Sequence, residues 1–237
     1  MEKVIGRKVI RLEEVSSTND YAKSVAREVP DGTLIVARRQ TSGRGRLGRR
    51  WLSPEGGLWL SVVLKPGFVD TRMVFVGALS VIDTLADFGI VSGIKWPNDV
   101  WVAGRKIAGV LLEAKGAEYT ILGLGLNVNN PTPRELEDRA VSMFELTGNI
   151  FSLDAVLKSL SFHMDAWYRI LKEDPFLLME KVRERTFILG RFVEVFDGDE
   201  RVVGMAVDVL DDGSLLLNVG GSLKRILYGD VSIRPLP

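Results

Sequence analysis

The chain has 237 residues and no net charge at neutral pH, with 31 basic and 31 acidic side chains. This size predicts one large domain, or one medium and one small domain, and the charge balance argues against a general nucleic-acid binder, whose binding domain is usually basic. The absence of cysteine excludes disulfides, a thiolate metal site and a cysteine nucleophile.

The single histidine, His163, excludes a histidine-rich metal site, and its place in a helical pattern favours an ordinary helix residue over a general base. The N-terminus lacks an apolar signal region, and no apolar run reaches the length of a membrane span. We therefore expect a cytoplasmic protein without membrane contact. The lack of cysteine, the single glutamine and the 26% of charged residues are a slight indication of a hot habitat.

The first 185 residues mix strand-like and helix-like patterns. Ser17–Asp20 has the spacing of a capping box and predicts a helix that runs to about Glu28. Apolar spacing predicts three more helices, over residues 71–88, 152–172 and 175–185. Apolar runs predict seven strands, at residues 9–14, 33–39, 58–65, 92–95, 100–103, 106–113 and 119–126, and the proline-bearing stretch 129–139 is predicted to be a loop.

The pattern changes near residue 190. From there on the chain consists of short alternating runs broken by Gly or Asp, at residues 192–196, 202–210, 214–219, 224–228 and 231–234. Five short strands in fewer than fifty residues predict a small β-barrel. We therefore expect two domains, residues 1–188 and residues 189–237.

The most distinctive segment is the loop Gln40–Trp51, which holds three glycines and four arginines between two predicted strands. Residues 38–50 contain six arginines, and no acid lies between Asp31 and Glu55. Glycine lets the backbone come close to an anion, and arginine forks onto carboxylate or phosphate oxygens. The loop is therefore predicted to hold an anion.

Two familiar interpretations of these glycines fail. Gly43–Gly48 fits the dinucleotide fingerprint G-x-G-x-x-G, but that motif needs a helix at its third glycine, and the following residues are broken by Pro54. The same glycines could form the glycine-rich loop of a protein kinase, and Asp87–Gly89 spells the kinase D-F-G motif. However, the H-R-D motif is absent, and Gly89 is a natural helix C-cap. A solvated basic loop remains as the plain structural alternative.

Three further segments carry groups suited to a binding site. Lys95–Asp99 presents an amide and a carboxylate after a proline, Lys106 stands at the head of an apolar strand with Gly109 following, and Gly123–Asn129 alternates glycines before Asn127. Taken singly, each segment also has a plain structural explanation: a turn for Lys95–Asp99, a surface lysine for Lys106 and a turn for Gly123–Asn129.

Together, and in this order, the segments resemble the biotin–protein ligase family, in its short form without an N-terminal DNA-binding domain. The resemblance covers residues 8–130 and the small C-terminal domain, and the matching motifs are Ser17–Asn19, Gly43–Arg49 with Trp51 and Ser53-Pro54, Lys95–Asp99, Lys106–Glu113 and Gly123–Asn129. It implies an α+β fold, a mixed sheet with packed helices as in class II aminoacyl-tRNA synthetases, followed by an SH3-like β-barrel.

The resemblance also implies a two-step reaction. Biotin and ATP with Mg²⁺ give biotinyl-5′-AMP and pyrophosphate, and a lysine of a biotin carboxyl carrier protein then takes the biotinyl group. A homodimer is the family expectation. Since the first predicted strand begins near Val9, we expect no winged-helix domain, no DNA binding and no repressor activity.

Each site residue has an expected role by this resemblance. Lys106 and Arg46 are expected to stabilise charge in the transition state, while Lys95 and Asp99 organise the site, Asp99 through magnesium. The residues expected to bind biotin are Ser17, Thr18, Asn19, Gln40, Gly43, Arg44, Gly45, Arg46, Lys106 and Gly109. Those expected to bind ATP are Arg46, Arg49, Trp51, Asn98, Lys106 and Asn127.

Two competing functions remain open on the sequence alone. A lipoate–protein ligase shares the fold and the adenylate chemistry, although the arginine-rich loop and Lys95–Asp99 favour biotin. A nucleic-acid-binding module would use the basic loop for backbone contact and Trp51 for stacking. Because like charges repel and glycine is costly to order, the loop of residues 40–53 is expected to be mobile until ligand binds.

Overall fold

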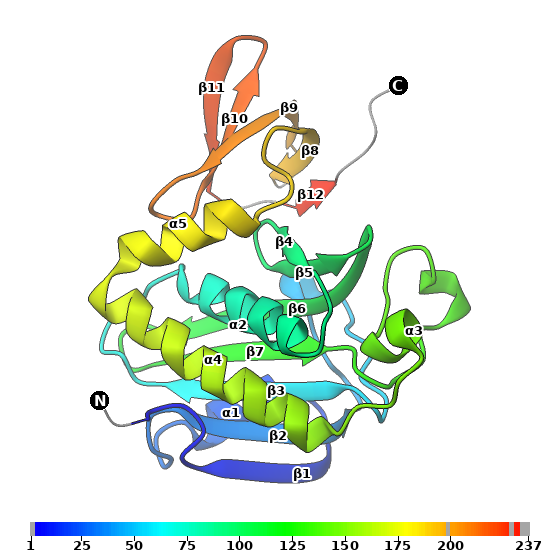
Figure 1. The fold of residues 1–237 in the computed structure, drawn as a ribbon. Coiled ribbons are helices and arrows are strands. Elements are labelled where there is room, and N and C mark those ends of the chain that lie inside the picture. The colour runs from blue at the N-terminus through cyan, green and yellow to red at the C-terminus, as the bar shows by residue number, and fades with distance from the viewer. Residues whose placement is uncertain (1–2, 198–199, 228–229, 233–237) are drawn as a thin grey trace.

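The computed structural model describes residues 3–197, 200–227 and 230–232 (Figure 1). Its larger domain is built on a seven-stranded mixed sheet in the order β1-β2-β3-β7-β6-β5-β4. β1 and β2 run parallel, and every other neighbouring pair is antiparallel. The strands, all predicted from the sequence, are β1 (Val9–Val15), β2 (Thr33–Gln40), β3 (Leu58–Leu64), β4 (Gly93–Lys95), β5 (Asp99–Val102), β6 (Arg105–Lys115) and β7 (Tyr119–Leu126).

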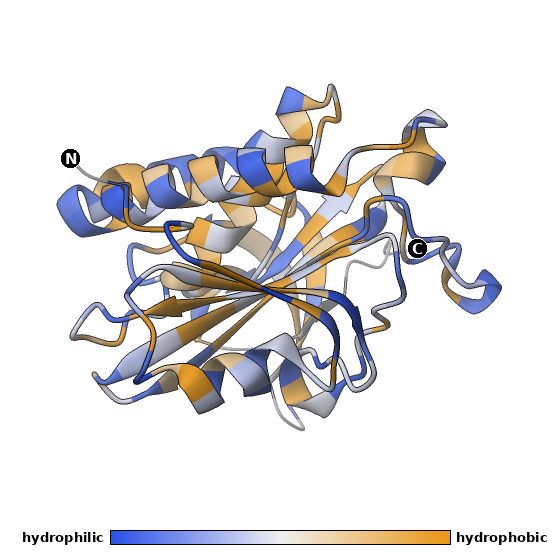
Figure 2. Ribbon diagram, turned by 90° about the horizontal axis from the view of Figure 1, so that it is seen from below, coloured by the Kyte–Doolittle hydropathy of each residue, from blue (hydrophilic) through white to orange (hydrophobic). Residues whose placement is uncertain are grey.

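Helices cover both faces of this sheet (Figure 2). On one face lie α2 (Met73–Asp87) and α4 (Leu153–Glu173), and α5 (Pro175–Arg185) leads from α4 to the smaller domain. On the other face lies α1 (Thr18–Val25), against β2, β3 and β7. α1 ends at Val25 rather than near Glu28, and residues 26–28 form turns instead that lead to Pro30 and β2.

A short helix, α3 (Met143–Thr147), lies where no element was predicted. Ser142 and Glu145 form a capping box at its start, and Gly148 ends it with φ 73°. A Ser followed by Glu three residues later is a sequence signal for a helix start, so this helix was predictable. Among the described residues, no helix has the length and apolar character needed to span a membrane.

The two faces of the sheet carry cores of different size. Leu122 and Leu124 of β7 point into the main core under α2 and α4, whereas Ile121 points into a smaller cluster under α1. Gly123 and Gly125 continue the alternation on the α1 side, where they add no side chain. The α1 face of the sheet is therefore bare beyond the helix, which leaves room for a cavity.

Asp165 of α4 fastens the N-terminal segment to the main core. Its carboxylate accepts hydrogen bonds from the backbone N–H groups of Val4 (2.7 Å) and Ile5 (2.9 Å) and pairs with Arg169. Burial acts to raise the pKa of Asp165, but the hydrogen bonds from Ile5, Arg169 and Val4 outweigh it and lower the pKa below its ordinary 3.8. The fold therefore stabilises the charged form.

We expect Asp165→Ala to lower the free energy of unfolding by about 3 kcal/mol, because it leaves two backbone N–H groups and Arg169 without their acceptor. In the unchanged protein this stabilisation is fully present above pH 3.8 and is lost as the pH falls through the lowered pKa of the folded state. Urea unfolding at neutral and acidic pH measures both effects. Asp154→Ala, which removes an exposed pair with Arg11 on the same helix, is the control and should cost less than about 1 kcal/mol. Equal losses in the two variants would contradict the anchoring role.

The smaller domain is a five-stranded antiparallel sheet in the order β11-β10-β9-β8-β12. Its strands correspond to the five predicted runs and are β8 (Phe192–Asp197), β9 (Glu200–Val209), β10 (Leu215–Val219), β11 (Ser222–Ile226) and β12 (Asp230–Ser232). The predicted ends of the last two runs, at residues 228 and 233–234, lie outside the described residues. The α+β class with a small C-terminal β-domain is confirmed, and the domain boundary between residues 188 and 189 stays a prediction.

Side chains tie the smaller domain to the larger one. The indole N–H of Trp96 donates to the carbonyl of Gly213, in the turn between β9 and β10 (2.8 Å). The Arg183 guanidinium of α5 donates to the carbonyl of Val209 (2.7 Å). Since Trp96 directly precedes Pro97 in the Lys95–Asp99 segment, the first of these bonds joins a predicted site segment to the smaller domain.

Candidate active site

A cavity of about 690 Å³ opens on the α1 side of the large sheet. Its walls come from the loop between β2 and β3, the start of α1, the strands β5, β6 and β7, and the segment 130–140. Gly43 and Lys95 do not line it, and the Lys95 ammonium lies over Trp101 instead, 4.1 Å from the ring centre. The other predicted site residues line it together: Ser17, Thr18, Asn19, Gln40, Arg44, Gly45, Arg46, Arg49, Trp51, Asn98, Asp99, Lys106, Gly109 and Asn127.

The arginine-rich loop is closed on itself by backbone hydrogen bonds. The N–H of Gln40 donates to Ser53 O (3.0 Å), and the N–H of Trp51 donates to Gly43 O (2.9 Å). A Cβ at Gly43 would lie 2.6 Å from Trp51 O, so this close approach requires glycine, and Gly43 shapes the loop. A single 3₁₀ turn ends at Gly48 with no helix after it, which confirms that the loop is not a dinucleotide fingerprint.

The floor of the cavity is made of glycine. Gly109 of β6 and Gly125 of β7 are direct cross-strand partners, and Gly123 lies two residues before Gly125. The indole of Trp51 rests on this pair, since a Cβ at Gly125 would lie 2.5 Å from Trp51 Nε1. At Gly123 a Cβ would lie 2.2 Å from Asn19 Oδ1. The site therefore depends on the absence of side chains at these strand positions.

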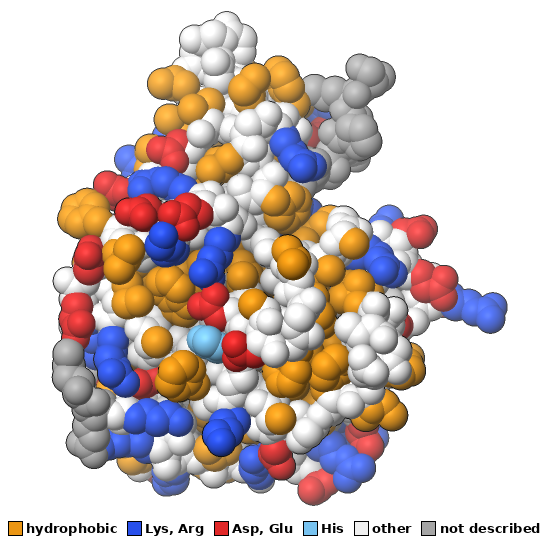
Figure 3. Space-filling model, viewed as in Figure 1, with side chains coloured by type: hydrophobic (Ala, Val, Ile, Leu, Met, Phe, Trp, Pro, Cys, Tyr) orange, Lys and Arg blue, Asp and Glu red, His pale blue; other side chains and the backbone are white. Residues whose placement is uncertain are grey.

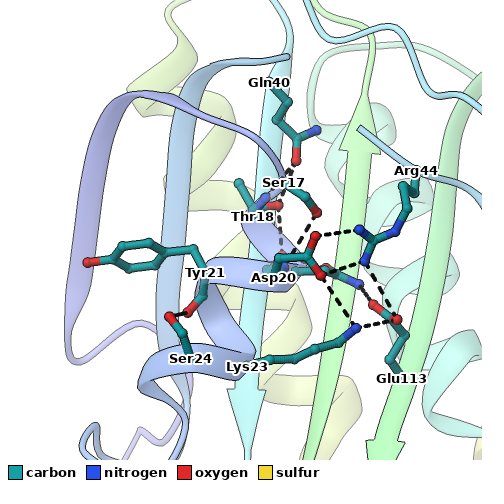
Figure 4. A network of polar contacts seen from close by, with 11 residues as sticks. Ser17, Thr18, Asp20, Tyr21, Lys23, Ser24, Gln40, Arg44 and Glu113 are labelled. Atoms are coloured by element: carbon teal, nitrogen blue, oxygen red, sulfur yellow. Dashed lines mark hydrogen bonds and ion pairs between the residues drawn. The ribbon is translucent and has the colours of Figure 1, made fainter. Parts of the chain in front are cut away.

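One end of the cavity is lined by uncharged hydrogen-bonding groups (Figure 4). The N–H of Thr18 donates to Gln40 Oε1 (2.8 Å), and Gln40 Nε2 donates to Ser53 Oγ (2.8 Å). Ser61 Oγ lies 2.8 Å from Thr18 Oγ1 and 2.6 Å from Asn19 Oδ1. Because these groups hold one another in place, this end suits a compact ligand group that is polar but uncharged.

Four charged side chains flank this neutral end. Arg44 Nη2 lies 2.6 Å from Asp20 Oδ1 and 3.9 Å from Glu113 Oε1, and Lys23 Nζ lies 2.5 Å from Glu113. The hydrogen bond between Arg44 and Asp20 lowers the pKa of Asp20 and raises that of Arg44. Sequence reasoning missed the roles of Asp20, Lys23 and Glu113. For Glu113 the sequence offered one signal, its place at the end of the motif Lys106–Glu113.

The other end of the cavity is cationic. Lys106 Nζ lies 2.6 Å from Asp99 Oδ1 and 5.0 Å from the centre of the Trp51 ring. Arg46 Nη1 donates to Asn98 Oδ1 (3.1 Å). The β4–β5 turn, the head of β6 and the arginine-rich loop thus bring two cations together, an arrangement suited to a carboxylate or a phosphate.

The segment after β7 was predicted to be a plain loop, but it forms a wall of the cavity. Asn127 Nδ2 donates to Val141 O (3.2 Å), and Asn127 Oδ1 accepts from Asn130 Nδ2 (3.1 Å). The backbone N–H of Lys106 donates to Arg139 O (2.8 Å), and the Val141 N–H donates to Lys106 O (3.0 Å). Asn127 therefore holds this wall beside Lys106.

The site has few side chains that could bind a metal ion. Among the described residues, no group of three or more His, Cys, Asp or Glu side chains is placed to hold an ion. Asp99, the residue expected to act through magnesium, is a single carboxylate paired with Lys106. Such a residue fits an ion that arrives on nucleotide phosphates and keeps several waters, as Mg²⁺ does.

Much of the loop's positive charge is matched by acids. At least three of the six arginines of residues 38–50 form ion pairs, Arg38 with Glu55, Arg39 with Glu14 and Arg44 with Asp20. This pairing argues against the alternative of a basic loop for nucleic-acid contact, which needs cations facing phosphates.

His163 of α4 lies beside α2, on a face where charges of both signs intermix (Figure 3). Its Nε2 atom lies 2.8 Å from Asp87 Oδ2, and it does not line the cavity. The structure thus agrees with the prediction of an ordinary helix residue.

Comparison with known proteins gives a consistent result for both domains. Residues 12–129 match the biotin/lipoate A/B protein ligase family, and residues 188–234 match the biotin protein ligase C-terminal domain. The bifunctional ligase/repressor BirA of Bacillus subtilis is 31% identical, with 97% of this chain and 75% of that protein covered. The biotin–[acetyl-CoA-carboxylase] ligase of Mycobacterium tuberculosis is 34% identical, with 85% of this chain and 79% of that protein covered.

The fold has close counterparts among solved structures. The biotin protein ligase from Aquifex aeolicus in complex with biotin and ATP has a TM-score of 0.87 and 36% identity, with 96% of this chain and 99% of that chain covered. The motifs, the order of the strands and the smaller domain lead to one conclusion. The chain belongs to the biotin protein ligase family.

Proposed function

We propose that the protein joins biotin to the α-phosphate of ATP as biotinyl-5′-AMP and then transfers biotin to a lysine of a carrier protein. The observation that supports this most directly is the division of the cavity, with an uncharged polar end beside Thr18 and Gln40 and a cationic end beside Lys106 and Arg46. Biotin has the same division, since its ureido head is uncharged and its tail ends in a carboxylate.

The first step brings two anions together. A biotin carboxylate oxygen attacks the α-phosphorus of ATP, and pyrophosphate leaves. Repulsion between two unit charges at 4 Å is ~1 kcal/mol in bulk water and several times more in a dry site. Lys106 and Arg46 supply the opposing positive charge, and no nucleophilic side chain is needed. Because Asp99 and Asn98 hold these two cations, they are oriented before the ligands arrive.

The remaining predicted residues have supporting roles in this proposal. Ser17, Asn19, Gly45 and Gly109 shape the biotin end and the floor. Arg49 and Asn127 serve ATP, and the Trp51 indole flanks the adenine. Mg²⁺, when bound, neutralises nucleotide phosphates, and Asp99 would hold it through one carboxylate.

In the second step the acceptor lysine attacks the acyl carbon of the mixed anhydride, and AMP leaves. The carrier is a biotin carboxyl carrier protein, as the name of the similar Mycobacterium tuberculosis enzyme suggests. We place the reaction in the cytoplasm and propose a homodimer, with residues 1–188 as the catalytic domain and residues 189–237 as the smaller domain.

Biotin-dependent exchange of label between pyrophosphate and ATP tests substrate and chemistry together. We expect exchange with biotin and none above background with lipoate, whose apolar dithiolane ring cannot hydrogen-bond to the polar groups around Thr18 and Gln40. Exchange with lipoate alone would show that the protein is instead a lipoate ligase. Salt-sensitive DNA binding without any exchange would favour the nucleic-acid alternative.

Arg46→Ala is expected to speed the loss of free biotinyl-5′-AMP from the enzyme by about tenfold, because it removes a charged hydrogen-bond donor at the reacting end. Asn98 would keep its bond to Val110 O (2.8 Å), so the turn that carries it should persist. The measurement is release of labelled adenylate from a preloaded enzyme during gel filtration. Arg105→Ala, at the start of β6, is the control. Unchanged retention in Arg46→Ala would contradict the contact with the intermediate.

A further inference from the structure

Four charged side chains from three separate elements meet beside the neutral end of the cavity, and of these Arg44 lines it (Figure 4). Asp20 and Lys23 come from α1, Glu113 comes from β6, and Arg44 comes from the arginine-rich loop. Two are acids and two are bases, so their formal charges cancel. Lys23 Nζ reaches both acids, 2.5 Å from Glu113 and 3.6 Å from Asp20.

Within this group the Arg44 guanidinium is already occupied. Both of its terminal nitrogens bond to the carboxylate of Asp20, Nη2 at 2.6 Å from Oδ1, and Nη2 lies 3.9 Å from Glu113. With both terminal nitrogens bonded to one carboxylate, the Arg44 guanidinium has no terminal nitrogen free to form a forked pair with an anionic ligand. Arg46, at the cationic end, donates to the amide oxygen of Asn98 (3.1 Å).

The group is also joined to the neutral end of the cavity. Asn19 Nδ2 donates to Glu113 Oε2 (2.6 Å), and Asn19 Oδ1 lies 2.6 Å from Ser61 Oγ. Asn19 itself rests directly on Gly123 of the floor. The position of Glu113 is therefore coupled to the groups that would receive the head of the ligand.

We propose that Arg44 is a latch that fastens the loop of residues 40–53 to α1, and that Asp20 and Glu113 are positioning residues that hold the latch. Closing the loop keeps the adenylate in the cavity, while Lys106 and Arg46 stabilise the reacting anions at the other end. This inference deepens the role of the cavity and rests on the proposed function. Two arginines of the loop therefore have different roles: Arg44 holds the loop closed, and Arg46 stabilises the charge of the reacting groups.

The first experiment is limited trypsin digestion without ligand, because the loop contains Arg46, Arg49 and Arg50 as cleavage sites in every Asp20 variant. Asp20→Asn should speed cleavage within the loop roughly fivefold, the effect of losing a partly exposed ion pair. Asp20→Glu keeps the carboxylate and should restore slow cleavage. Salt should speed cleavage of the unchanged protein but not of Asp20→Asn. Glu118→Gln, which breaks the exposed Arg27 pair outside the cavity, is the control and should cleave slowly.

The second experiment measures release of labelled biotinyl-5′-AMP from Asp20→Asn, Arg44→Gln and the double variant. A latch predicts roughly fivefold faster release in each single variant and no further increase in the double variant, since both changes remove the same bond. Effects that multiply in the double variant would show that Arg44 contacts the ligand directly and would overturn the latch. Unchanged loop cleavage in Asp20→Asn would overturn it as well. Absence of pyrophosphate exchange in the unchanged enzyme would refute the proposed function, while the digestion would still decide the latch.

Discussion

Replacing Lys106 by alanine should reduce biotin-dependent pyrophosphate exchange by ~10²–10³-fold, the usual cost of losing one preorganised charge contact. The substitution removes the ammonium that lies 2.6 Å from Asp99 and 5.0 Å from the centre of the Trp51 ring. It leaves the backbone bonds from Lys106 to Arg139 and Val141 in place, so the cavity wall should persist. The loss should therefore appear in the rate of adenylation and not in the amount of folded protein.

The matched control is Lys115→Ala, on the same strand, whose ammonium lies 3.8 Å from the exposed Glu118. This variant should exchange at a near-normal rate. Lys106→Arg keeps the charge with a different shape and should recover part of the activity. Thermal unfolding establishes that each variant is folded. A folded Lys106→Ala enzyme with near-normal exchange would refute the role of Lys106 in charge stabilisation.

Gly123→Ala should weaken biotin binding by up to ~10²-fold, the effect of overpacking by about 3 kcal/mol. The added Cβ would lie 2.2 Å from Asn19 Oδ1. Asn19 cannot retreat easily, because Ser61 and Glu113 hold its amide at 2.6 Å on each side. One methyl group therefore disturbs both the floor of the cavity and the polar groups above it. Isothermal titration calorimetry with biotin measures the change.

A second variant tests whether the loss comes from the contact between the new methyl group and Asn19 or from a general loss of stability. Adding Asn19→Ala to Gly123→Ala removes the colliding amide, so the thermal stability should rise above that of the single variant. Biotin affinity should stay low, because a proposed biotin-binding residue is then missing. Tight biotin binding by Gly123→Ala alone would show that the floor tolerates a side chain at this position.

The sequence predicted the strands of the large sheet well, because each one is an apolar run bounded by Gly, Pro or polar residues. It did not predict their order. The pairing of β3 with β7 joins residues 58 and 126, and nothing in the local pattern of either strand specifies the other. The resemblance to a family, rather than periodicity, indicated the architecture.

The same contrast holds within the site. Lys106 and Arg46 stand in compact motifs and were identified from the sequence. Lys23 and Glu113 each look like an ordinary surface charge, because they are 90 residues apart and only the fold brings them to 2.5 Å. The segment 130–140 likewise looks like a plain loop in the sequence. It becomes a wall of the cavity only because Ala140 pairs with Lys106 of β6, which lies more than thirty residues earlier in the chain.

The bond between Trp96 and Gly213 limits how the smaller domain can be exchanged. Gly213 has φ 87°, and a Cβ there would lie 2.9 Å from the Phe75 ring, so the β9–β10 turn is fitted to the larger domain at both points. Trp96 belongs to the same short turn as Asn98, which holds Arg46. A chimera that takes residues 189–237 from a relative would need a β9–β10 turn that still accepts the hydrogen bond from Trp96. Without that bond, the turn that carries Asn98 and positions Arg46 would lose its support from the smaller domain.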